Sequence, residues 1–158
     1  MPVVSAALTD LGLRRPANEY SLVSRPGLGL YAVCDGMGGH NAGEVASKMA
    51  IEALDSFIQR SHREKKITWP YGLDANLSFA GNRLKTAVKL ANRKVFRAAD
   101  NREDYTGMGT TVVVGVFQGR RLMLGHIGDS RCYRLRAGVL EQITRDHSWL
   151  QEQIDAGL

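Results

Sequence analysis

An aspartate at the end of an apolar run is the first residue of this sequence that could do chemistry. Asp35 follows LGLYAVC (residues 28–34) and opens DGMGGH (residues 35–40). Glycines let a backbone approach a ligand closely and expose its carbonyl groups. A carboxylate beside bare carbonyls suits a hard divalent cation such as Mg²⁺ or Mn²⁺. The same pattern is equally typical of a glycine-rich turn between a strand and a helix, with Asp35 as a cap.

Arg15 and Glu19 form a second candidate group, in RRPANEY (residues 14–20). An arginine presents a planar fork that matches the oxygens of a phosphate group. Glu19 could reach a metal directly or through water. Taken alone, the pair favours a salt bridge on a surface loop.

Asp129 is a third candidate, in GHIGDSR (residues 125–131), where a glycine precedes it between two apolar segments. A turn aspartate commonly accepts hydrogen bonds from nearby backbone amides, so a structural role competes with a metal-binding one. The neighbouring His126 is interpreted as a packed strand histidine.

The elements that must position these residues follow from hydrophobic periodicity and turn signals. Each candidate position follows or adjoins an expected strand, and two expected helices lie between Asp35 and Asp129. This order favours an α+β fold with helices packed on an antiparallel sheet. The expected strands are 3–9, 28–34, 110–117, 122–127, 131–136 and 139–144; the expected helices run from 42 to the charged segment 60–66, over about 76–99, and over 148–156.

Length and composition indicate one soluble domain over residues 1–158. The chain has 44% hydrophobic and 23% charged residues, which excludes a disordered chain. No apolar run is long enough for a membrane span, and the N-terminus lacks the basic segment of a secretory signal. Cys34 and Cys132 lie far apart in apolar sequence, which indicates buried thiols in a reducing compartment and a cytoplasmic protein.

Positive charge is concentrated in the middle of the chain. The net charge is +5, and residues 58–103 hold eleven Lys and Arg against four Asp and Glu. A basic segment could bind nucleic acid. Because no aromatic residues are interleaved as a stacking platform, a solvated helix face is the favoured interpretation, and no nucleic-acid partner is expected.

Five motifs taken together resemble a known family. They are TDLGLRRPANEY, YAVCDGMGGHNAGEVAS, MGTTVVVG, GHIGDSRCYRL and LEQITRDHS, in this order along the chain. The sequence from about Ala6 to Leu158 is similar to the N-terminal two-thirds of bacterial metal-dependent Ser/Thr protein phosphatases of type 2C, the PPM family. The resemblance implies an antiparallel β-sandwich flanked by helices, here incomplete at the C-terminus, with a binuclear Mn²⁺ or Mg²⁺ centre at one edge.

The resemblance also implies roles for the metal-site residues. Asp35 would bridge the two metals, and Gly36 would give one of them its backbone carbonyl. Glu19 would act on the metal shell through water, and Asp129 would match a carboxylate associated with a third, weaker metal. A water bound to such cations is deprotonated near neutral pH, and the cations neutralise charge on the phosphoryl oxygens.

Two further residues complete the implied chemistry. Arg15 would hold the substrate phosphate, and His40 would be the general acid that protonates the poor alkoxide leaving group. The implied reaction is hydrolysis of phosphoserine and phosphothreonine in proteins of bacterial signalling, themselves substrates of a cognate Ser/Thr kinase.

Two departures from the family pattern open an alternative. Tyr20 stands where the family motif has an aspartate, and a neutral phenol is a poor ligand for a hard cation. The sequence also stops after the TRDHS segment (residues 144–148), before two later aspartate-bearing motifs of the family. We therefore expect weak metal binding and self-association through exposed sheet edges. The alternative function is a weakly active or inactive pseudophosphatase fragment that binds a phosphoprotein or a partner chain.

Overall fold

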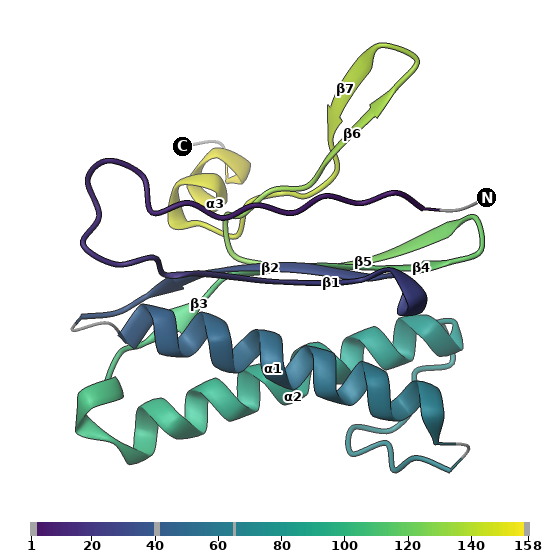
Figure 1. Cartoon of the computed structure of the whole chain (residues 1–158), viewed down its shortest axis with the longest axis horizontal. Helices are drawn as coiled ribbons and strands as arrows, with labels where there is room; N and C mark the ends of the chain where they lie inside the picture. The colour runs from purple at the N-terminus through teal and green to yellow at the C-terminus, as the bar shows by residue number, and fades with distance from the viewer. Residues whose placement is uncertain (1–2, 40–41, 65, 157–158) are drawn as a thin grey trace.

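A computed structural model describes residues 3–39, 42–64 and 66–156 (Figure 1). Two long helices form one layer, and an antiparallel sheet lies across them. The elements are β1 (Tyr20–Arg25), β2 (Leu30–Met37), α1 (Ala42–Arg63), α2 (Phe79–Asn101), β3 (Gly109–Thr110), β4 (Val112–Gln118), β5 (Arg121–Ile127), β6 (Tyr133–Arg136), β7 (Val139–Gln142) and α3 (Trp149–Asp155), with 3-10 turns at Pro26–Leu28 and Glu103–Tyr105.

The sheet has the strand order β1-β2-β4-β5, and the short β3 pairs with the end of β2. All of these pairs are antiparallel. Alternate residues of β2 and β4 point at the helices, as the period of two in a strand requires. The residues on this face are buried: Leu30, Ala32 and Cys34 in β2, and Val112, Val114 and Val116 in β4.

Both helices pack on this face through small and branched apolar residues. Ala46, Ala50 and Leu54 of α1 are buried, as are Ala87 and Ala91 of α2. The helices expected from residues 42 and 76 are confirmed. The second begins at Phe79 rather than near 76 because Ser78 caps it, accepting a hydrogen bond from the Gly81 amide at 3.0 Å.

One prediction about strands was wrong, and one strand was not predicted. Residues 3–9 are not a strand: this segment crosses the sheet on the side away from the helices and has no backbone ladder partner among the residues that the structure describes (Figure 1). Apolar composition favours an extended chain, but a strand also needs a neighbour with free backbone groups. Conversely, β1 was missed because YSLVSR is half serine and arginine, with only Val23 buried.

The far face of the sheet carries little regular structure. The N-terminal segment, α3 and the β6–β7 ribbon lie on that side (Figure 1), and Val33 of β2 remains 49% exposed there. The α+β fold with helices on an antiparallel sheet is confirmed. Of the helices in the described ranges, none has the length and apolar character needed to span a membrane.

Candidate functional site

Hydrogen bonds hold both the amide and the carbonyl group of Asp35. Its amide donates to the Thr111 hydroxyl at 3.1 Å, and its carbonyl accepts from the Thr111 amide at 2.9 Å and from the Thr110 hydroxyl at 3.0 Å. These residues come from the GTT segment (residues 109–111), which crosses from β3 to β4. Three hydrogen bonds therefore hold the backbone of Asp35 near the end of a central strand.

The Asp35 carboxylate lies among charged groups from three separate parts of the chain. Burial raises its pKa above the ordinary value, and the negative charge of Asp129 raises it further. Arg15 lowers this pKa, and the charge of Glu19 raises it. The charges of Asp129, Glu19 and Arg15 thus all act on the Asp35 carboxylate, and the two negative ones would favour a cation beside it.

Arg15 and Glu19 form the ion pair that the sequence indicates. Arg15 Nη1 lies 3.4 Å from Glu19 Oε2, and the Arg15 side chain is 70% exposed against 19% for Glu19. Such an exposed pair contributes little to stability. The guanidinium is therefore anchored at one nitrogen while most of its surface faces solvent.

Gly36 follows Asp35 and lies against the start of α1. Its amide donates to the Glu19 carbonyl at 3.0 Å. A Cβ at Gly36 would clash with the backbone carbonyl of Gly43, and a Cβ at Gly43 would clash with the Glu19 carboxylate. Two glycines thus let β2, α1 and Glu19 approach closely, which brings Glu19 beside the Asp35–Gly36 peptide.

Asp129 lies in the tight turn after β5, where the preceding Gly128 has a φ of +96°. Ser130 in this turn shares a 2.6 Å hydroxyl contact with Thr111, the residue that holds the Asp35 amide. The turn is therefore connected directly to the backbone of Asp35.

A second connection fixes the same turn from the other side. Arg131 makes a bidentate pair with Asp146, with Nε–Oδ1 at 2.9 Å and Nη2–Oδ2 at 2.7 Å. The His147 amide donates to the Gly128 carbonyl at 2.8 Å, and the rings of His126 and His147 lie 4.7 Å apart. The DHS segment (residues 146–148) thus holds the turn that carries Asp129.

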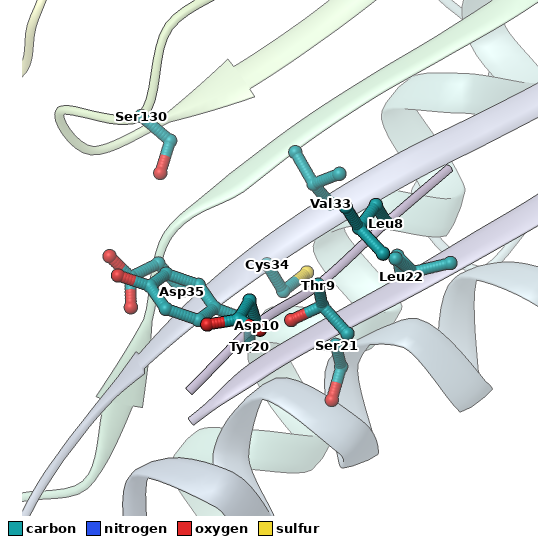
Figure 2. A pocket seen from close by; sticks show the side chains of 10 residues that line it. All are labelled: Leu8, Thr9, Asp10, Tyr20, Ser21, Leu22, Val33, Cys34, Asp35 and Ser130. Carbon is teal, nitrogen blue, oxygen red and sulfur yellow. The ribbon is translucent and has the colours of Figure 1, made fainter. Parts of the chain in front are cut away.

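A pocket of about 310 Å³ opens beside Asp35 (Figure 2). Leu8, Leu22 and Val33 form its apolar end, and Tyr20 and Asp35 lie together at the other, with Ser130 across from them. Tyr20 is the cross-strand partner of Asp35, so the phenol stands on the same face of the sheet as the carboxylate.

The donor chemistry at Asp35 suits a hard cation, since carboxylate and backbone carbonyl oxygens are the ligands that Mg²⁺ and Mn²⁺ prefer. The described residues offer too few such oxygen ligands for a complete metal site. Within the described ranges, no three His, Cys, Asp or Glu side chains converge closely enough to hold a metal. The structure brings Arg15, Glu19, Asp35 and Asp129 to one region; His40 lies outside the described residues.

Sequence reasoning missed the residues that hold the site together. The paired threonines Thr110 and Thr111, Gly43, and the Arg131–Asp146 pair have roles that only the three-dimensional contacts reveal. The sequence did contain a signal for these residues. The GTT, GEVAS and DHS segments all belong to the motifs of the family resemblance, yet none of them had been given a role.

Comparisons with known proteins show the family of this chain. The sequence pattern of the family described as Protein phosphatase 2C matches residues 19–152. The serine/threonine protein phosphatase PstP of Mycobacterium tuberculosis is 41% identical over 152 residues, covering 96% of this chain and 26% of that protein. The serine/threonine phosphatase stp of Listeria monocytogenes is 31% identical, covering 94% of this chain and 56% of that protein.

Solved structures give the same result. The crystal structure of the Mycobacterium tuberculosis phosphatase PstP/Ppp has a TM-score of 0.78 and 40% identity, covering 96% of this chain and 58% of that one. The PstP catalytic domain in complex with two manganese ions has a TM-score of 0.77 and 39% identity, covering 96% and 59%. This chain thus spans less than two thirds of these relatives. The family resemblance of the five motifs is confirmed, and the chain belongs to the protein phosphatase 2C family.

Proposed function

We propose that this chain contributes to the hydrolysis of phosphoserine and phosphothreonine in proteins. The observation that carries the proposal is that the charges of Glu19, Asp129 and Arg15 all act on the partly buried carboxylate of Asp35. Negative charge for a cation and an exposed guanidinium for an anion stand side by side there. The relatives named as serine/threonine protein phosphatases support the same reaction.

We assign a divalent cation, Mn²⁺ or Mg²⁺, to the Asp35 carboxylate and the Gly36 carbonyl. Glu19 and Asp129 stand further out, and the relative with two manganese ions supports this assignment. When bound, such cations supply a water of lowered pKa and neutralise charge on phosphoryl oxygens. Thr110 and Thr111 keep the Asp35 backbone in place, which fixes the position from which its carboxylate would reach the ion.

Arg15 and His40 complete the proposed chemistry. The exposed guanidinium of Arg15 binds the phosphate of the substrate, and its contact with Glu19 keeps the fork near Asp35. His40 donates a proton to the serine or threonine oxygen as the phosphorus–oxygen bond breaks; its role rests on the sequence alone. The expected partners are phosphorylated proteins and, through them, a cognate Ser/Thr kinase. We also propose a cytoplasmic location, which the free thiols of Cys34 and Cys132 support, and a single phosphatase-like domain over residues 1–158.

Tyr20 favours a second candidate function. Its ring stands beside Asp35, at a position where the family motif has a carboxylate, and the donors in the described part of the chain fall short of a full metal site. A chain with Arg15 but without turnover would bind phosphoproteins as a pseudophosphatase.

One experiment separates the two functions. Phosphate release from a phosphothreonine peptide is measured in millimolar Mn²⁺ for the wild type, Asp35→Asn and Asp100→Asn, a matched change at the exposed end of α2. We expect slow, metal-dependent release that Asp35→Asn abolishes and Asp100→Asn leaves unchanged. Peptide binding without release, lost in Arg15→Ala, would establish the pseudophosphatase function. Release that survives Asp35→Asn would refute the proposed metal site.

A further inference from the structure

An apolar groove runs between α2 and the edge strand β5, outside the candidate site. β5 is the last strand of the sheet, so one side of its backbone has no strand beside it in the described structure. The groove has a volume of about 540 Å³ where Leu84 and Val88 of α2 face Met123 and Leu124 of β5. It continues past Val88 into a hollow of about 380 Å³ beside Phe96 and Ile127.

The floor of this groove is unusually apolar for a surface. Phe96 is 67% exposed, and Leu77 and Ile127 are about two fifths exposed. Apolar side chains that gather along one groove, rather than scatter singly, are typical of an interaction surface. An edge strand beside such a groove presents unpaired backbone groups to which another chain can add a strand.

The rim of the groove is basic. Lys85, Lys89 and Arg93 line it from α2, and no acidic residue lines it in the described part of the chain. Lys85 is already held by Asp74 at 2.8 Å, whereas Lys89 packs over the ring of Tyr71 and, like Arg93, is exposed. The charge therefore selects an occupant that carries carboxylates.

The same charge disfavours a second copy of this chain at this edge. A symmetric pairing of β5 with β5 would bring the α2 side chains Lys89 and Arg93 of both copies to one interface, where like charges repel. Self-association through exposed sheet edges, expected from the sequence, is thus unfavourable at β5.

We propose that the β5 edge and the α2 groove bind an extended acidic segment of another protein. The segment adds a strand antiparallel or parallel to β5. Its alternate apolar side chains lie on Leu84 and Val88, and its carboxylates meet Lys89 and Arg93. This docking surface does not depend on metal or on the phosphatase reaction.

The test uses an eight-residue peptide of alternating Val and Glu, labelled with fluorescein, and measures binding to the 158-residue chain by fluorescence anisotropy. We expect saturable binding that weakens as salt rises. Lys89→Glu combined with Arg93→Glu should weaken binding at least tenfold. The matched control Lys48→Glu, at an exposed position of α1, should change it less than twofold.

Strand addition is tested separately with two N-methylated forms of the peptide, each blocking the amides along one edge. Because only one edge of an added strand pairs with β5, one form should bind and the other should not. Equal binding of both forms would overturn strand addition. Equal binding of a Val and Lys peptide, or dimerisation that the Lys89→Glu and Arg93→Glu changes leave unaltered while the peptide fails to bind, would overturn the acidic partner.

Discussion

Asp35 holds a negative charge at a position where the fold disfavours it. Partial burial and the charges of Asp129 and Glu19 raise its pKa, and only Arg15 opposes them. A carboxyl group with a raised pKa destabilises the folded chain whenever it is ionised. Functional sites commonly retain such groups, because a bound cation relieves the repulsion between neighbouring carboxylates.

We predict that Asp35→Asn raises the thermal unfolding midpoint of the metal-free chain at pH 7. The wild-type carboxylate is ionised there and repels its neighbours, whereas the amide is neutral. Since the pKa is raised in the folded state, this difference should shrink as the pH falls through that raised value. It should vanish below the ordinary aspartate value of about 3.9. Calorimetric scans in chelator across this pH range measure the effect; a lower midpoint for Asp35→Asn at pH 7 would contradict it.

Tyr20 is the residue whose replacement should strengthen the site. Tyr20→Asp places a second carboxylate opposite Asp35 on the same face of the sheet. Mn²⁺ should bind roughly tenfold more tightly, and the metal-free chain should lose stability because like charges then face each other across the strands. Tyr20→Phe is the control, with unchanged metal affinity. Titration calorimetry and unfolding scans check both signs, and equal affinities of Tyr20→Asp and wild type would reject the role of position 20.

At the scale of elements, the site depends on close contact between β2, α1 and the loop that carries Glu19. Gly36 and Gly43 make this contact possible, and Thr110 and Thr111 attach β2 to β4 through the backbone of Asp35. The turn after β5 is attached in the same way, through Ser130 and the Arg131–Asp146 pair. These contacts hold Glu19, Asp35 and the turn of Asp129, which are far apart in the sequence, in fixed positions relative to one another.

A glycine series tests the contact between β2 and α1. Gly36→Ala places a methyl group against the backbone of Gly43, which cannot move aside, and should cost about 3 kcal/mol of unfolding free energy. Gly43→Ala meets the end of the flexible Glu19 side chain first and should cost less. Gly27→Ala, which meets nothing within 4 Å, should change the unfolding free energy by less than about 0.5 kcal/mol. Urea unfolding measures the series, and an equal effect of all three would refute the packing argument.

The Arg131–Asp146 pair predicts a dependence on pH. Hydrogen bonds from Arg131 lower the pKa of Asp146. A lowered carboxyl pKa stabilises the fold above the ordinary aspartate value, and this stability is lost as the pH falls through the lowered value. Asp146→Asn should therefore reduce the urea midpoint at pH 7, and the difference from wild type should shrink as the pH falls below the ordinary aspartate value. A difference that stays constant over this pH range would show that the charge of Asp146 is not what holds the turn.

Sequence reasoning succeeded where a pattern is local and failed where a partner decides the outcome. The period of 3.6 located α1 and α2, and turn glycines separated β4, β5, β6 and β7. Residues 3–9 have the composition of a strand, but a strand also needs a neighbouring strand to pair with. β1 was not predicted because its one buried residue, Val23, lies in a segment that is half serine and arginine and gives no apolar pattern. For the site, Asp35 and Asp129 could be singled out as candidates, yet that Asp129 influences Asp35 follows only from the folded turn.

At the scale of the whole molecule, the two faces of the sheet are unequal. One is covered by α1 and α2, and the other carries the N-terminal segment and α3 (Figure 1). Val33 of β2 and Leu8 of the N-terminal segment are exposed. This chain spans 58% of the solved chain of its relative from Mycobacterium tuberculosis. An apolar surface of this kind favours association.

We predict that the 158-residue chain self-associates through this open face at micromolar concentrations. Val33→Ser should weaken association at least tenfold, because burying a valine contributes roughly 1.5–3 kcal/mol. Lys89→Glu on the opposite layer should not weaken it. Sedimentation equilibrium measures both variants, and a wild-type chain that stays monomeric would contradict the prediction.

Mn²⁺ binding to Asp35 is the central claim, and calorimetric titration of Mn²⁺ into wild type, Asp35→Asn and Asp100→Asn tests it most directly. We predict weak, saturable binding to wild type and Asp100→Asn. Asp35→Asn should bind Mn²⁺ at least tenfold more weakly, because that change removes the only charged ligand assigned to the cation. Equal binding by all three proteins would contradict the assignment of a metal to Asp35 and, with it, the proposed reaction.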